Sequence, residues 1–81
     1  MKPLSLPRQR ALHNVDIGAI TYHDGKWYQK GWWQPLNGRA YTWALEHDLI
    51  EVIHHRDISR PSWVRLLAKG KDVLDGKAPP P

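Results

Sequence analysis

The feature that most constrains this chain is a helical pattern that runs directly into a strand pattern, between Asn37 and Ile53. Asn37 has a side chain that can accept a hydrogen bond from the first turn of a helix, and apolar residues then recur at spacings of three and four. Past Asp48 the residues become β-branched and alternating, which is typical of a strand. We therefore predict a helix at 37–48 and a strand at 49–54. The apolar stripe of this helix consists of Ala40, Tyr41, Ala44, Leu45 and Leu49.

The size and composition of the chain exclude several classes of protein. At 81 residues it forms one small domain of marginal stability, so most large apolar side chains must enter the core. It has no cysteine, which excludes disulfides, thiolate zinc sites and cysteine nucleophiles. No apolar run approaches the roughly 18 residues that cross a bilayer, and the N-terminus lacks a hydrophobic signal core. We therefore expect a cytoplasmic protein without a membrane partner.

Charge and aromatic content both point towards binding. Twelve Lys and Arg against eight Asp and Glu give a net charge of +4, which favours anionic partners such as nucleic acid. The aromatic residues are five Trp and three Tyr, with no Phe. Trp and Tyr carry a polar group and suit half-buried positions and interfaces.

Before the central helix, the sequence predicts an arm, a short helix and a hairpin. Residues 1–7 contain two prolines and are expected to form an N-terminal arm, with a two-turn helix following from Arg8 to about Val15. Asp24-Gly25 lies between two β-rich runs, and both positions of a two-residue hairpin turn need positive φ. A hairpin is therefore predicted at 19–29.

After the central strand, the sequence predicts a second hairpin, a last helix and a tail. A strand at 63–67 follows a polar connection and is expected to pair with the strand at 49–54. Helical spacing returns from Ala68 to Leu74, and Gly76 ends it. The Pro-rich residues 77–81 are expected to be a disordered tail. The domain itself would then span residues 8–76.

The part from about residue 37 to 75 resembles the winged-helix family, and most closely its MarR- and PadR-like branches. Those domains have a helix followed by a Gly-Leu-Ile-Glu-like start of a strand, where this chain has Asp48-Leu49-Ile50-Glu51. A basic hairpin, the wing, then leads to Leu-Thr-x-x-Gly-x-x-x-Leu, where this chain has Leu66-Leu67-Ala68-Lys69-Gly70-Lys71-Asp72-Val73-Leu74. The resemblance implies a small α+β, winged-helix-like fold, in which a hairpin occupies the place of the family's second helix.

The resemblance also implies DNA binding and transcription regulation. A recognition helix at about 37–48 would enter the major groove, and a wing at about 54–63 would touch the backbone or the minor groove. Five basic residues against one acid between Arg56 and Lys71 agree with this expectation. Double-stranded DNA is then the expected partner. The residues that would contact it are Asn37, Arg39, Thr42, Trp43, Arg56, Arg60, Arg65 and Lys69.

A second hypothesis is a protein-interaction module, such as a phage- or plasmid-type inhibitor that binds a host protein. Trp32 and Trp33 are the candidate interface, because Trp is a frequent hot spot of protein interfaces. Adjacent residues in an extended chain point to opposite sides, so we do not expect both to be fully buried. Trp27, Trp32 and Trp33, with the lysines among them, also have the aromatic and basic mixture that binds single-stranded nucleic acid. Trp27 itself is expected in the core.

The sequence does not favour catalysis or metal binding. The five His have no spacing that matches a known metal site. No Ser-His-Asp order, Gly-rich phosphate loop or acid pair stands in a recognisable context. We therefore expect no enzyme activity, no metal and no cofactor. The sequence does not decide whether the protein forms a homodimer, since many winged helices dimerise but no long terminal helix is present to drive dimerisation.

Overall fold

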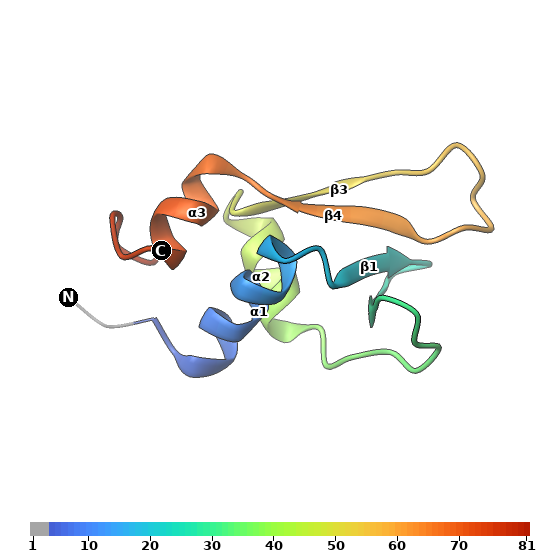
Figure 1. The fold of residues 1–81 in the computed structure, drawn as a ribbon, viewed down its shortest axis with the longest axis horizontal. Helices are drawn as coiled ribbons and strands as arrows, with labels where there is room; N and C mark the ends of the chain where they lie inside the picture. The colour runs from blue at the N-terminus through green and yellow to red at the C-terminus, as the bar shows by residue number, and fades with distance from the viewer. Residues whose placement is uncertain (1–3) are drawn as a thin grey trace.

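The structure is a computed structural model that describes residues 4–81, which form three helices and one four-stranded antiparallel sheet (Figure 1). The elements in chain order are α1 (Leu6–Asp16), β1 (Ile20–His23), β2 (Lys26–Gln29), α2 (Arg39–Glu46), β3 (Ile50–Ile53), β4 (Ser62–Leu66) and α3 (Ala68–Leu74). The strands lie in the order β2-β1-β4-β3. The predicted α+β class is confirmed. Residues 1–3 of the predicted arm lie outside the described residues.

Both predicted hairpins form, and they join into one sheet. In the first, Asp24 and Gly25 have φ values of 49° and 78°, as a two-residue hairpin turn requires. The second pairs β3 with β4 over four residue pairs. The two hairpins are connected by the pairing of β1 with β4, which places Thr21 opposite Trp63. This pairing joins segments about forty residues apart, so local sequence patterns could not predict it.

All three helices end in the same way. In each, two successive amides past the last turn donate to carbonyl oxygens of that turn, in the nested pattern of a Schellman motif. The residue in the left-handed conformation is Gly18 after α1, Asp48 after α2 and Gly76 after α3. Asp tolerates this conformation better than most residues. The predicted abrupt change from helix to strand at Asp48 is therefore confirmed.

The helices begin slightly away from the predicted positions. α1 starts at Leu6, two residues earlier than predicted, because Pro7 fits the first turn of a helix, where no amide donor is needed. α2 starts at Arg39 instead of Asn37. The side-chain oxygen of Asn37 still accepts a hydrogen bond from the amide of Arg39, at 3.2 Å. Asn37 thus helps to start α2 from outside the helix.

The burial of Trp43 shows that the predicted orientation of the central helix is wrong. The sequence placed it on the free side of α2, yet its side chain is buried, with an exposed fraction of 8%, whereas Leu45 of the predicted stripe is exposed. The prediction assumed one buried stripe, but α1 packs along a flank of α2. The guanidinium of Arg8 on α1 lies 4.4 Å from the centre of the Trp43 ring. Trp43 is therefore part of the helix–helix contact.

α3 meets the start of β3 through a glycine. Gly70 is buried, and a Cβ atom at this position would overlap the carbonyl oxygen of Leu49 and lie 2.8 Å from Cδ1 of Leu66. The same carbonyl oxygen accepts a hydrogen bond from the amide of Leu67, at 2.9 Å. The close approach of α3 to the backbone of Leu49 thus requires a residue without a side chain.

The segment after Gly76 forms no helix or strand, as predicted. The amides of Lys77 and Ala78 nevertheless donate to the carbonyl oxygen of Asp72, and Ala78 packs against the core. The beginning of the predicted disordered tail is therefore attached to the domain. Along residues 4–81, no helix combines the length and apolar character needed to cross a membrane.

The contact at Gly70 generates a stability prediction. Gly70→Ala should lower the free energy of unfolding by about 1–3 kcal/mol, because the added methyl group meets backbone that cannot yield. At an unstrained, exposed helix position the same change would raise the free energy of unfolding by up to about 1 kcal/mol. Urea unfolding followed by circular dichroism measures the difference. Lys69→Ala on the exposed side of α3 is the control, with an expected change within about 0.5 kcal/mol. Equal or greater stability of Gly70→Ala would show that the close packing is not needed.

Candidate functional site

The two faces of the sheet have different surroundings. Residues opposite each other in neighbouring strands share a face, so the register sorts every strand residue. One face carries Ile20, Trp27, Ile50 and Val64, which belong to the core together with residues of the helices. Within residues 4–81, the buried apolar residues of the helices belong to this core, and the other face of the sheet is open. Its residues are Thr21, His23, Lys26, Tyr28, Glu51, Ile53, Trp63 and Arg65.

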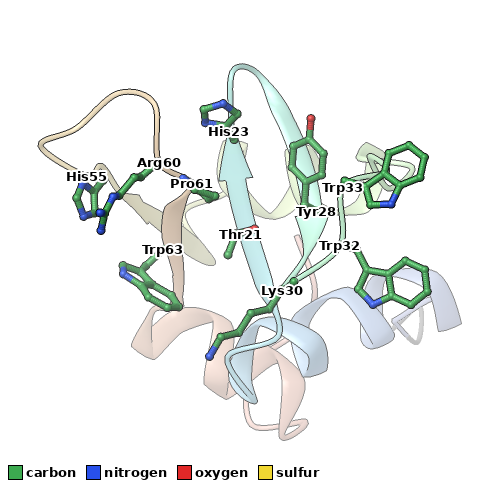
Figure 2. A pocket seen from close by; sticks show the side chains of 11 residues that line it. Thr21, His23, Tyr28, Lys30, Trp32, Trp33, His55, Arg60, Pro61 and Trp63 are labelled. Atoms are coloured by element: carbon green, nitrogen blue, oxygen red, sulfur yellow. The ribbon is translucent and has the colours of Figure 1, made fainter.

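A hollow of about 550 Å³ lies on the open face of the sheet (Figure 2). Figure 2 shows Trp32 and Trp33 on one side of it and Trp63, Arg60 and His55 on the other. The lining residues come from β1, β2, β4 and the loops that follow β2 and β3. They are Thr21, His23, Tyr28, Lys30, Gly31, Trp32, Trp33, His55, Arg60, Pro61 and Trp63.

Exposed aromatic rings are the main feature of this hollow. The exposed fractions are 51% for Trp63, 62% for Trp32 and 82% for Trp33. Each half-exposed Trp forgoes on the order of 1–2 kcal/mol of hydrophobic stabilisation relative to full burial. In a small domain that needs its apolar surface for the core, such a concentration is typical of an interaction site.

The loop that carries Trp32 and Trp33 is held at both ends. At its start, the amide of Lys30 donates to the carbonyl oxygen of Ala19 at 2.7 Å. At its end, Tyr28 and Pro35 form a β-bridge, and the amide of Leu36 donates to the carbonyl oxygen of Trp27 at 2.8 Å. The two exposed indoles thus project from an anchored loop. The expectation that these two residues are not both buried is confirmed, as is the predicted burial of Trp27.

The charges around the hollow are positive. Lys30 and Arg60 contribute cations, and the ammonium of Lys30 lies 5.3 Å from the centre of the Trp63 ring. Among residues 4–81, no carboxylate lines the hollow. The nearby Glu51 forms an ion pair with Arg65 across β3 and β4. The surface therefore combines flat aromatic faces with positive charge.

The loop between β3 and β4, residues 54–61, is shaped by its own hydrogen bonds. The carboxylate of Asp57 accepts from the amide and the hydroxyl of Ser59, at 3.0 and 2.6 Å. Because these bonds stabilise the ionised form, they lower the pKa of Asp57 below its ordinary value. Asp57 also lies 3.9 Å from the guanidinium of Arg60, an exposed contact of little energy. Arg56 and Arg60 are both exposed.

The structure does not gather the predicted DNA-contacting residues in one hollow. Asn37 and Arg39 line a separate hollow of about 640 Å³ between α1 and the start of α2, together with Arg10. Thr42 is exposed on α2 and Lys69 on the first turn of α3. Trp43, being buried, cannot reach a DNA groove. Arg65 is exposed but paired with Glu51.

Sequence reasoning missed Tyr28 and Trp63 as site residues, whereas Lys30 was among the lysines named beside the tryptophans. Alternation within the predicted strand at 63–67 puts Trp63 and Val64 on opposite faces, and this is the available signal. The position of Trp63 in the site depends on the pairing of β1 with β4. This pairing places Trp63 beside Thr21, which in turn lies opposite Tyr28.

Comparisons of this chain with known protein families, with curated proteins and with solved structures gave no significant match. The candidate site therefore rests on its own geometry. Over residues 4–81, no three His, Asp or Glu side chains come together in a way that could hold a metal ion.

The hydrogen bonds of Asp57 generate a prediction about pH. Ser59→Ala should raise the pKa of Asp57 towards its ordinary value, because the hydroxyl donor is lost while the amide donor remains. Since folding lowers this pKa, the stabilisation of the loop is present above the ordinary pKa and is lost as pH falls through the lowered one. Carboxyl carbon NMR during acid titration measures the pKa, with Ser59→Thr as the control that keeps a hydroxyl. An unchanged pKa in Ser59→Ala would contradict the assignment.

Proposed function

We propose that this protein is a small DNA-binding regulatory protein of the cytoplasm, winged-helix-like in its second half. Double-stranded DNA would be held by the exposed side of α2 and by the loop at 54–61. The observation that carries this proposal is the shape of the β3–β4 hairpin, which runs out beyond the helices (Figure 1) and presents Arg56 and Arg60 at its exposed end. A projecting basic hairpin is suited to contact phosphates.

The order of elements supports this assignment. α2 leads through Asp48 into β3, the hairpin returns along β4, and α3 packs back through Gly70. This is the order that the resemblance to winged helices implies for residues 37–75. The first hairpin replaces the family's second helix, so the likeness is confined to the second half of the chain.

The N-terminal half of α2 has exposed residues that support the proposal. Arg39 and Thr42 lie in its first half, and recognition helices contact bases mainly with their N-terminal residues. Glu46, which would repel phosphates, is the last residue of the helix. An approach by the N-terminal half of α2 would keep this carboxylate away from the DNA backbone.

The test is the binding of duplex DNA by the double variant Arg56→Ala/Arg60→Ala. We expect its affinity at low salt to fall about tenfold, and the slope of log affinity against log salt to become shallower by about 2, because two phosphate contacts are lost. Fluorescence anisotropy with a labelled duplex measures both. Arg65 is left intact, because its removal would leave Glu51 unpaired.

A matched control removes the same charge elsewhere. Lys26→Ala/Lys77→Ala also lowers the net charge by two, at exposed positions outside α2 and the 54–61 loop. It should retain most of the affinity. If the wild type binds no duplex at low salt, or if both double variants lose affinity equally, DNA binding by α2 and the hairpin is wrong.

A protein partner is the second candidate, and the exposure of Trp32 and Trp33 favours it. If a host protein binds there, Trp32→Ser/Trp33→Ser should lose a partner that the wild type retains on an affinity column, while Ile17→Ser, another exposed apolar residue, should keep it. The same set of retained proteins for wild type and the double Trp variant would exclude this interface.

A further inference from the structure

Three residues form a straight row across the open face of the sheet. Thr21 on β1 lies opposite Tyr28 on β2 and opposite Trp63 on β4. Neighbouring strands are about 4.8 Å apart, so the backbones of Tyr28 and Trp63 are about 10 Å apart. The small side chain of Thr21 lies between the two aromatic side chains. The row therefore presents two rings with a gap between them.

The spacing of the two strands that carry these rings is close to the length of a few stacked nucleotides. A stacked strand advances about 3.4 Å per nucleotide, so about three nucleotides span the distance between the two backbones. Bases of every kind have a flat face that stacks on Tyr or Trp. Bases in a duplex are already stacked and paired, which prevents them from lying flat on these side chains.

Two cations lie beside this row of residues. The ammonium of Lys30 is 5.3 Å from the centre of the Trp63 ring, and Arg60 lines the same hollow. The carboxylate of Glu51 is paired with Arg65. Arg60 makes only an exposed contact of 3.9 Å with Asp57, so the positive charge at the rings, chiefly that of Lys30, can attract an anionic ligand.

We propose that the open face of the sheet binds single-stranded nucleic acid, with bases stacked on Tyr28 and Trp63 and phosphates held by Lys30 and Arg60. This surface is separate from the exposed side of α2 and shares only Arg60 with the duplex site proposed above, and its ligand differs from that duplex. An acidic peptide could satisfy the cations, but two aromatic side chains on backbones about 10 Å apart favour stacked bases.

The first measurement is the affinity for a labelled oligothymidine of about 12 nucleotides, a typical length for one such site, followed by fluorescence anisotropy. Tyr28→Ala and Trp63→Ala should each weaken binding about 10- to 100-fold, because each removes one stacking partner. Tyr28→Phe keeps the ring and should bind within about threefold of the wild type. Ile17→Ala, at an exposed apolar residue on the helical side, should change nothing. Circular dichroism confirms that each variant is folded.

Two further ligands separate stacking from charge. An abasic strand of the same length carries the phosphates without bases and should bind the wild type at least about tenfold more weakly. A polyglutamate peptide of equal charge should also bind more weakly. Equal binding of the abasic strand, tighter or equal binding of the peptide, or no effect of Tyr28→Ala and Trp63→Ala would each overturn the proposal.

The same variants separate this surface from the proposed duplex site. Tyr28→Ala and Trp63→Ala should keep the affinity for duplex DNA, while Arg39→Ala should lose duplex affinity and keep that for oligothymidine. If the protein binds oligothymidine through its rings but binds no duplex, only the duplex proposal fails. If it binds duplex alone, the assignment of the open sheet face fails.

Discussion

The contact between Gly70 and the backbone of Leu49 determines how the helices meet the sheet. The side chain of Leu49 is fully buried, its amide closes the end of α2 on the carbonyl oxygen of Ala44, and its own carbonyl oxygen accepts from Leu67 just before α3. Leu49 thus closes the end of α2, directly precedes β3 and contacts α3. Because α3 can approach this backbone only at a glycine, the direction of the hairpin relative to the helices depends on Gly70.

That arrangement places the core on one face of the sheet and leaves the other face open. On the core side, Trp27 stacks on Tyr41 with 5.6 Å between ring centres and meets Tyr22 edge-on at 4.7 Å. These aromatic contacts stabilise the fold. On the other side, Tyr28 and Trp63 face outward beside Lys30. Strand alternation therefore separates the structural aromatic residues from those available to a ligand, although Trp27 and Tyr28 are adjacent in sequence.

Local signals in the sequence were sufficient for most of the elements. The Asp24-Gly25 turn, the end of α2 at Asp48 and the alternation of β4 each depend on a few consecutive residues, and the structure confirms all three. The burial of Trp43 was not predictable in this way, because it results from α1 packing on α2. Arg56, Arg60, Trp32 and Trp33 could be named from the sequence as candidate contact residues, but the row through Tyr28 and Trp63 depends on the long-range pairing of β1 with β4.

The most direct test of DNA binding by α2 and the hairpin is an NMR titration of the nitrogen-15-labelled protein with a duplex of about two helical turns. The account predicts that the amide signals of Arg39, Thr42, Arg56 and Arg60 shift together. The indole N–H signals of the buried Trp27 and Trp43 should stay in place. Shifts confined to the Trp32 and Trp33 loop, or no shifts at low salt, would contradict it.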